Sequence, residues 1–328
     1  HFYSDEQALS LVEDLVDLGP SAIEYIDKAT LDASKDNIEQ QGNRVWIDGD
    51  PESVLIIDFF SDTPKRLDFL IAECQAILQA NGSYSIKLID KSDRNKVWGV
   101  RKAGLGLLMG KVGPKKAIAV IEDAAVPVSR LYSYYQEIKS LMKSYGVDAV
   151  YYGHASVGLI HIRPILDLSK NKDQKIMHSI AKKVSKIVKK YHGSLSGEHG
   201  DGRVRAPFLE EQFGRVVYQY FVDLKYTFDP GNLFNPGVIL SDKSIVEDLR
   251  PVVSQQELTT AFNWKGDLSF FYAVEKCNGA GVCRKSTGGN MCPSYRATRS
   301  EEFSTRGRAN LLRKALSAEN PTKSLKSS

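Results

Sequence analysis

Two histidines seven positions apart lie in a short glycine-containing segment, which is the spacing that a two-histidine metal site needs. The segment runs Gly153-His154-Ala-Ser-Val157-Gly158-Leu-Ile-His161. If Val157-Gly158 forms a two-residue turn, His154 and His161 become direct cross-strand partners with Cβ atoms about 5 Å apart. At that separation two imidazoles converge on one divalent ion.

An acid and a third histidine lie together in a second glycine-rich segment, Gly197-Glu198-His199-Gly-Asp-Gly202. The glycines let the backbone approach a ligand closely. Glu198 would complete a site of two histidines and one carboxylate, which leaves His199 to act as a general base. The alternative is that each histidine is an ordinary core or surface residue.

Three cysteines, Cys277, Cys283 and Cys292, are crowded near the end of the chain, and the last is followed by proline. Thiolates in this arrangement suggest an iron–sulfur site. A structural zinc site is the alternative, but it normally needs four ligands. No histidine follows His199, and Cys74 lies in a helical pattern that predicts a buried core thiol.

The bulk composition excludes some classes of function. A net charge of +4, with no basic stripe, argues against nucleic-acid binding. No apolar run reaches the length of a membrane span. Clustered cysteines without a secretion signal indicate a reducing, cytoplasmic setting. Because the sequence does not begin with Met, we expect it to be a fragment of a longer protein.

Apolar periodicity predicts the elements that position these residues. Residues 5–34 are expected to form two helices, and Gly193 is expected to end the last long helix. Strands are predicted at 54–60, 83–89 and 117–121, a hairpin at 149–152 and 159–162, and helices at 64–80, 93–109, 131–145 and 172–191. This order favours an α+β fold, with an antiparallel sheet covered by helices, over a strictly parallel sheet.

The histidine–glutamate pattern resembles the C-terminal domain of FAD-linked oxidases in the vanillyl-alcohol oxidase superfamily. That group includes D-lactate dehydrogenases, glycolate oxidase subunits and D-2-hydroxyglutarate dehydrogenases. Two further segments agree, since Trp98-Gly-Val-Arg101 resembles the Trp-x-x-Arg segment and Asp229-Pro…Asn235-Pro-Gly resembles the closing segment of the family. The four motifs occur in the family's order over about residues 5 to 240, and the resemblance implies a ferredoxin-like antiparallel sheet.

The resemblance implies a role for each matching residue. His154, His161 and Glu198 would hold a divalent metal, zinc or similar, with His199 as the catalytic base. Arg101 would bind the substrate carboxylate, and Asn235 would lie near the flavin. The FAD itself would be bound mainly by a domain that precedes this chain.

The chain departs from the family at several positions. Many relatives have Gly, Asp and Asn where Ser156, Val157 and Leu159 stand, so polar groups that support the metal ligands are missing here. Arg163 would bind the second carboxylate of a diacid, or else it is a surface charge. Lys116 is the candidate for the family's substrate-binding lysine.

The cysteine segment resembles the ferredoxin part of long bacterial fusions with FAD-linked oxidases. The resemblance implies a 4Fe-4S cluster on Cys277, Cys283 and Cys292 that carries electrons from reduced flavin to an acceptor. The fourth ligand would come from a second motif in a cysteine-rich region beyond Ser328, so the ligand set here is incomplete.

The sequence therefore predicts a substrate-binding (cap) domain at 1–248, a linker at 249–264 and a partial 4Fe-4S ferredoxin-type segment at 265–328. Together with FAD, the cap domain would oxidise a D-2-hydroxy acid of the D-2-hydroxyglutarate or D-lactate type. The location would be the cytoplasm, or the inner membrane as a peripheral protein. The alternatives are a metal-free glycolate or D-lactate oxidase subunit, a non-catalytic electron-transfer or docking module, and a zinc-stabilised binding module.

Overall fold

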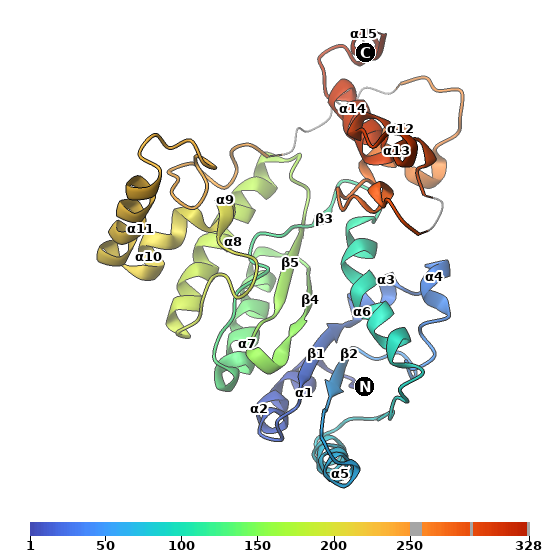
Figure 1. Ribbon diagram of the computed structural model, residues 1–328, viewed down its shortest axis with the longest axis vertical. Coiled ribbons are helices and arrows are strands. Elements are labelled where there is room, and N and C mark those ends of the chain that lie inside the picture. The colour runs from blue at the N-terminus through green and yellow to red at the C-terminus, as the bar shows by residue number, and fades with distance from the viewer. Residues whose placement is uncertain (250–257, 289–290, 327–328) are drawn as a thin grey trace.

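The computed structural model describes residues 1–249, 258–288 and 291–326 (Figure 1). The strands are β1 (Ala22–Asp27), β2 (Ser53–Asp58), β3 (Lys116–Ala117), β4 (Ala149–His154) and β5 (His161–Leu166). The α-helices are α1 (Asp5–Ser10), α2 (Val12–Val16), α3 (Lys28–Ala33), α4 (Ile38–Gln41), α5 (Pro64–Ala80), α6 (Arg94–Met109), α7 (Val128–Tyr145), α8 (Asn171–Lys190), α9 (Gly202–Arg205), α10 (Leu209–Phe213), α11 (Arg215–Phe228), α12 (Phe270–Glu275), α13 (Pro293–Thr298), α14 (Thr305–Leu316) and α15 (Pro321–Lys326).

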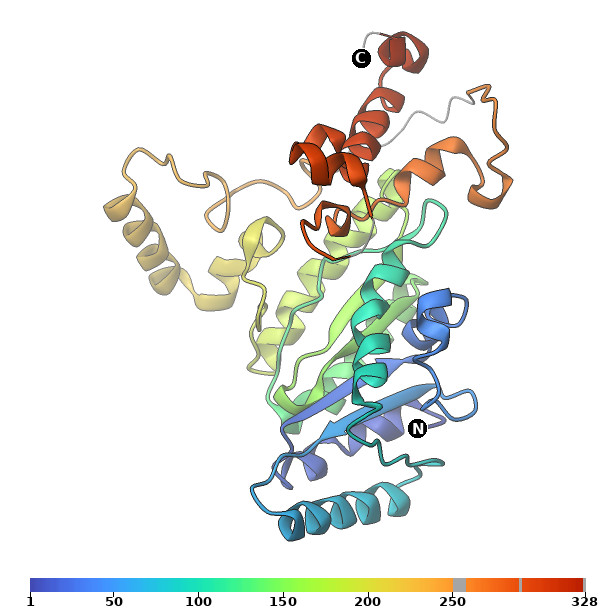
Figure 2. The same cartoon turned by 45° about the vertical axis from the view of Figure 1, so that its right-hand side comes forward.

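The strands form one sheet in the order β2-β1-β4-β5-β3, and every neighbouring pair is antiparallel. Helices α1, α2, α7 and α8 pack on one face and share the large core with it, while α3 and α6 lie over the other face (Figure 2). The prediction of an α+β fold with an antiparallel sheet is confirmed.

Strand alternation decides which side chains meet below α6. In β1, Ile23 and Tyr25 point into the large core, whereas Glu24 and Ile26 point to the opposite face. The same alternation in β4 and β5 sends Tyr151 and Ile162 into the large core. The face beside α6 therefore carries the alternate residues of these strands, including Tyr152, His154, His161 and Arg163.

Capping residues set the ends of the predicted helices. Helix α5 begins after Thr63, whose hydroxyl accepts a hydrogen bond from the Arg66 amide, and Pro64 occupies its first turn. Helix α7 ends at Gly146, which has a positive φ of 62°. The predicted helices at 64–80, 93–109, 131–145 and 172–191 are confirmed to within a few residues.

Four predictions of local structure are wrong. Residues 5–34 hold the central strand β1 as well as helices, because Ala22–Asp27 is buried between neighbouring strands and pairs on both edges. Residues 83–89 form no strand, and 117–121 contribute to β3 only at Ala117. Helix α8 is followed by His192 in the left-handed region, φ 57°, so Gly193 is not its stop.

The turn between the two metal-binding candidates also differs from the prediction. Ala155–Val157 forms a turn of 3-10 helix, and Gly158 follows with φ 71°. His161 therefore lies opposite Tyr152, and His154 lies opposite Glu24 on the neighbouring strand. The two histidines are diagonal neighbours rather than direct partners, a distance that long side chains still bridge.

The C-terminal residues form a small helical segment beside the sheet domain. Ser304 caps α14 by accepting a hydrogen bond from the Gly307 amide. Helix α14 packs on α12 and α15. Residues 250–257 of the predicted linker lie outside the described residues.

Across the three described ranges, none of the helices is both long and apolar enough to cross a lipid bilayer.

Gly158 is expected to be essential for the turn between β4 and β5. A Cβ atom at this position would lie 1.8 Å from the Val126 carbonyl oxygen, and φ is positive. We expect Gly158→Ala to lower the free energy of unfolding by more than about 2 kcal/mol. A steric clash adds to the cost of placing an alanine in the left-handed backbone region. Gly146→Ala is the matched control, because φ is 62° there but the space is open, and it should cost about 1 kcal/mol. Urea unfolding of both variants measures the two losses of unfolding free energy, and equal losses would contradict the prediction.

Candidate metal and substrate site

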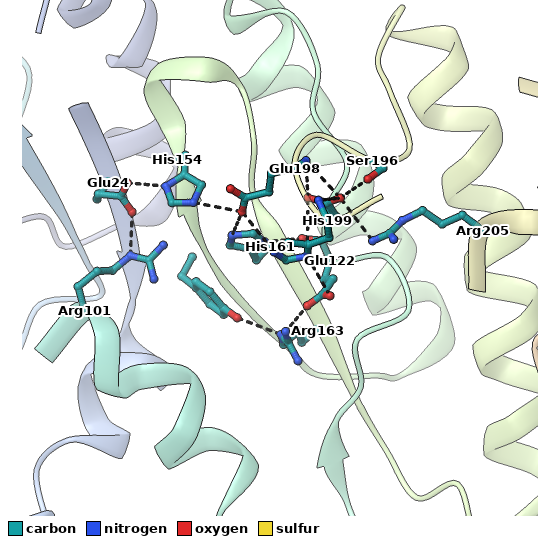
Figure 3. A network of polar contacts seen from close by, with 12 residues as sticks. Glu24, Arg101, Glu122, His154, His161, Arg163, Ser196, Glu198, His199 and Arg205 are labelled. Carbon is teal, nitrogen blue, oxygen red and sulfur yellow. Dashed lines mark hydrogen bonds and ion pairs between the residues drawn. The ribbon is translucent and has the colours of Figure 1, made fainter. Parts of the chain in front are cut away.

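The structure brings His154, His161 and Glu198 together at one point (Figure 3). The Nε2 atoms of the two histidines lie 3.3 and 3.4 Å from the same oxygen, Glu198 Oε1. The imidazole centroids are 5.4 Å apart. His154 closes β4, His161 opens β5, and Glu198 comes from the loop after α8.

A buried aspartate holds the glutamate-bearing loop in place. Asp123 is completely buried, and its carboxylate accepts the amides of Glu198 (3.2 Å) and His199 (2.9 Å) and the hydroxyl of Ser196 (2.5 Å). Burial by itself would raise the pKa of Asp123, but these hydrogen bonds bring that pKa below its ordinary value. The carboxylate is thus kept ionised as the anchor of the loop.

The outer nitrogens of both candidate ligands are already hydrogen-bonded. His154 Nδ1 lies 2.5 Å from Glu24 Oε1, and His161 Nδ1 lies 2.6 Å from the Glu122 carbonyl oxygen. These acceptors place the ring proton on Nδ1 and leave each Nε2 lone pair facing Glu198. Metal-binding histidines have this arrangement, so the residues fit a divalent ion.

The two histidines differ in how readily they are protonated. The hydrogen bond to Glu24 raises the pKa of His154, while desolvation by burial lowers the pKa of His161. A low pKa keeps His161 neutral, which is the form that binds a metal.

His199 lies beside this group and contacts acids on both of its nitrogens. Its Nε2 is 3.4 Å from Glu198 Oε1, and its Nδ1 is 3.3 Å from Glu122 Oε1. Its ring stacks on that of His161, with centroids 5.5 Å apart. The carboxylate at Nδ1 orients the ring, as expected of a histidine that accepts a proton at the other nitrogen.

Arg101 reaches the site from α6. Its Nε donates to Glu24 Oε2 at 2.8 Å, and its guanidinium lies over the ring of Tyr152, 5.1 Å from the centroid. Its two terminal nitrogens have no hydrogen-bond partner among the described residues. That edge of the guanidinium is available for a carboxylate.

Arg163 is buried, 6% exposed, so it is not a surface charge. Its Nε donates to the Tyr152 hydroxyl at 3.0 Å, and its Nη2 pairs with Glu122. Tyr152 thus lies between two arginines that both face the side of the sheet carrying the histidines.

Two predicted site residues are not gathered with the others. Lys116 lies in β3 at the sheet edge and donates to the Lys111 carbonyl at 2.5 Å. Asn235 is exposed, with φ 50°, in the loop that follows α11.

The three clustered cysteines are free thiols in the C-terminal segment. Cys292 is buried, and hydrogen bonds from Thr305 and the Tyr295 amide lower its pKa to about 7. Arg306 lies near Cys277 and Cys283 and donates to the Gly279 carbonyl at 3.0 Å. In the described ranges no cysteine joins a set of ligand atoms within 4.8 Å of one another, the close gathering that a single zinc ion needs.

Four residues of the site were missed by reasoning from the sequence: Glu24, Glu122, Asp123 and Tyr152. Glu24 was hidden in a stretch that was interpreted as helical. The other three were visible only as ends of predicted strands. An acid directly after an apolar run, as in Val-Ile-Glu122-Asp123, was the one available signal.

Comparison with known proteins identifies the family to which the chain belongs. Residues 1–239 match the family model for the C-terminal domain of FAD linked oxidases. The chain belongs to this family. The matched range of the FAD linked oxidases includes the candidate site from Glu24 to Asn235, whereas the cysteine segment lies outside it.

Several curated relatives are enzymes of 2-hydroxy acids. The chain is 30% identical over 312 residues to a D-2-hydroxyglutarate dehydrogenase of Pseudomonas putida, covering 90% of this chain and 30% of the relative. It is 27% identical to the D-2-hydroxyglutarate dehydrogenase of Escherichia coli, covering 95% of the chain and 32% of the relative. A D-lactate dehydrogenase of Archaeoglobus fulgidus is 26% identical, covering 67% of the chain and 46% of the relative.

These matches differ in extent. The chain spans about a third of the length of the D-2-hydroxyglutarate dehydrogenases that it matches. A match over 95% of the chain must continue past residue 239 and through the cysteine segment, whereas a match over 67% need not. Among solved structures, 4-ethylphenol oxidase from Gulosibacter chungangensis shares the fold, with a TM-score of 0.51, 12% identity, and coverage of 72% of this chain and 52% of that one.

Proposed function

We propose that this domain forms the substrate side of a FAD-dependent dehydrogenase that oxidises a D-2-hydroxy acid to the 2-oxo acid. The observation that carries the proposal is the convergence of His154 and His161 on Glu198 Oε1, with His199 as the neighbouring base. The 2-hydroxy-acid substrate class is supported by the dehydrogenases among the relatives.

His154, His161 and Glu198 would hold a divalent ion, zinc or similar, through two Nε2 atoms and one carboxylate. When bound, such an ion lowers the pKa of a coordinated hydroxyl group. FAD supplies the acceptor for the two electrons that leave the substrate as the C2 hydride. The alternative without a metal is the glycolate or D-lactate oxidase subunit type.

The chain's own residues bind the substrate and move one proton. Arg101 offers its terminal nitrogens to the C1 carboxylate, while its Nε is held by Glu24. His199 Nε2 accepts the proton of the 2-hydroxyl group, and Glu122 at 3.3 Å from Nδ1 stabilises the imidazolium that results. The ring of Tyr152 lies against one face of the Arg101 guanidinium, holds it in place and excludes water from that face.

Further residues are assigned by their place in the family. Lys116 is proposed to contact the substrate, and Asn235 is proposed to lie near the flavin. Both would need the rest of the enzyme to bring them to the reacting atoms. The cap domain is proposed to span 1–248, followed by a linker at 249–264 and the cysteine segment at 265–328.

The cysteine segment is proposed to hold part of a 4Fe-4S cluster through Cys277, Cys283 and Cys292. Support comes from free thiols, one with a pKa near 7, and from Arg306 beside the other two. Gly279 and Gly281, between Cys277 and Cys283, both have positive φ. Such a cluster would pass electrons from the reduced enzyme to an acceptor in a reducing, cytoplasmic compartment.

Metal analysis together with turnover tests the proposal. We expect about one equivalent of zinc or a similar ion per chain, and D-2-hydroxy-acid oxidation in an enzyme that also includes the FAD-binding part. Turnover without stoichiometric metal would favour the metal-free oxidase subunit. If the protein shows neither bound metal nor turnover, the docking module is the better description.

Arg163 is expected to determine whether the enzyme prefers a substrate with a second carboxylate. In the FAD-containing enzyme, Arg163→Met should reduce kcat/KM for D-2-hydroxyglutarate by about 10- to 100-fold more than for D-lactate, since one charged hydrogen bond is lost. Glu122→Gln, which removes the acid paired with Arg163, should shift the same ratio toward the diacid. The ratio cancels general damage to the site, and an unchanged ratio in both variants would assign Arg163 a structural role.

A further inference from the structure

A buried glutamate on a central strand connects two residues to which different roles are assigned above. Glu24 lies within β1 and is 5% exposed. Its Oε1 is 2.5 Å from His154 Nδ1, and its Oε2 is 2.8 Å from Arg101 Nε (Figure 3). Both carboxylate oxygens are therefore used, one on the metal side and one on the substrate side.

We propose that Glu24 is a positioning residue that fixes His154 for metal binding and Arg101 for carboxylate binding at the same time. The inference rests on the proposed function, because it takes the roles of His154 and Arg101 from there. It adds a residue from a segment that the sequence patterns did not single out.

The first effect of Glu24 is on the imidazole. A carboxylate at Nδ1 holds the ring proton there and turns the lone pair of Nε2 toward Glu198, 3.3 Å away. Without that acceptor the ring can rotate or carry its proton on the metal-facing nitrogen. Partners of this kind typically change metal affinity by about 10- to 100-fold.

The second effect is on the guanidinium. Glu24 takes the Nε hydrogen, and the ring of Tyr152 lies against the guanidinium face. The remaining freedom of Arg101 is small, so its two terminal nitrogens are held in a fixed plane. A fixed fork loses less entropy when it binds a carboxylate.

Zinc binding to the 328-residue chain tests the inference without FAD. Zinc affinity is measured by competition with a chromophoric chelator for the wild type and for Glu24→Gln. We expect the dissociation constant to rise by about 10- to 100-fold in the variant. Glu275→Gln is the matched control, since Glu275 also pairs with an arginine, Arg313 at 3.2 Å, but lies in α12 away from the site.

Further variants separate positioning from general destabilisation. In a His154→Ala background, Glu24→Gln should weaken zinc binding no further, whereas an independent tenfold loss would overturn the inference. Glu24→Asp keeps the charge but shortens the side chain, so it should fold and still bind zinc more weakly. Thermal unfolding with chelator present verifies the fold of each variant.

The outcomes also separate this inference from the proposed function. If the wild type binds no zinc, the metal site of the proposed function fails, and Glu24 loses the role assigned here with it. If the wild type binds zinc and Glu24→Gln and Glu24→Asp bind it equally well, only the role of Glu24 fails. In the FAD-containing enzyme, a rise in KM that exceeds the fall in kcat for Glu24→Gln would support the effect on Arg101.

Discussion

Replacing His199 by alanine is expected to reduce kcat for D-2-hydroxy-acid oxidation by about 10²- to 10⁴-fold in the FAD-containing enzyme. His199 accepts the hydroxyl proton in the proposed reaction, and its Nδ1 is oriented by Glu122 at 3.3 Å. Its side chain is largely exposed, so removing it leaves no buried cavity. Steady-state kinetics with saturating substrate measures the loss.

Two controls define the cause of that loss. FAD content should stay at the wild-type level, and metal content is measured beside it, because His199 lies with Asp123 and Glu198 in a second group of potential ligands. His178→Ala, on α8 and away from the site, should leave kcat unchanged. If His199→Ala retains wild-type turnover, another group accepts the proton and the assignment of the base is wrong.

The pH profile gives a further check on the same residue. A general base acts only when deprotonated, so kcat/KM of the wild type should fall in acidic solution. That limb of the profile should be lost in His199→Ala, since the residual rate no longer depends on the imidazole. A purely structural residue would lower the rate without changing the shape of the profile.

Much of the site was accessible from the sequence because its ligands lie in two compact segments. His154, His161, Glu198 and His199 fall within glycine-flanked stretches whose residue types imply the chemistry, and the structure brings them together. Arg101 was reached through the resemblance to a family rather than through periodicity. The chemistry-bearing side chains were therefore predictable as a set.

The geometry that holds those residues was not predictable, since it depends on contacts between distant segments. Glu24 is 130 positions from His154, and Asp123 is 75 from Glu198. The turn was assigned two residues, yet Gly158 must fit against the Val126 carbonyl, which lies on another segment. Nothing local to residues 154–161 encodes that approach, so the register of the two histidines was wrong by two positions.

The central strand was missed for a related reason. Ala22–Asp27 alternates between the two faces of the sheet, and both faces are covered, so its apolar residues Ile23, Tyr25 and Ile26 look continuous. Such a run does not distinguish a buried strand from a helix. Tertiary packing settles the choice, and with it the position of Glu24 beneath the site.

Removing one ligand is expected to abolish stoichiometric zinc binding by this chain. Structural zinc sites gain about 10–16 kcal/mol from about four ligands, so each contributes about 3–4 kcal/mol. His161→Ala should therefore raise the zinc dissociation constant by about 10² to 10³-fold. The residue is buried, 5% exposed, and its Nε2 lies 3.4 Å from Glu198 Oε1.

Metal-dependent stability separates the loss of a ligand from damage to the core. A bound ion stabilises the folded chain by RT ln(1 + [L]/Kd), about 4 kcal/mol at a thousandfold excess over Kd. Adding zinc should therefore raise the unfolding temperature of the wild type and of His178→Ala, but not that of His161→Ala. The comparison is made against each variant with chelator, so a lower baseline stability cancels. An equal zinc-induced rise in all three proteins would place the ion elsewhere and contradict the site, because His161 can contribute to binding only through the Nε2 that faces Glu198.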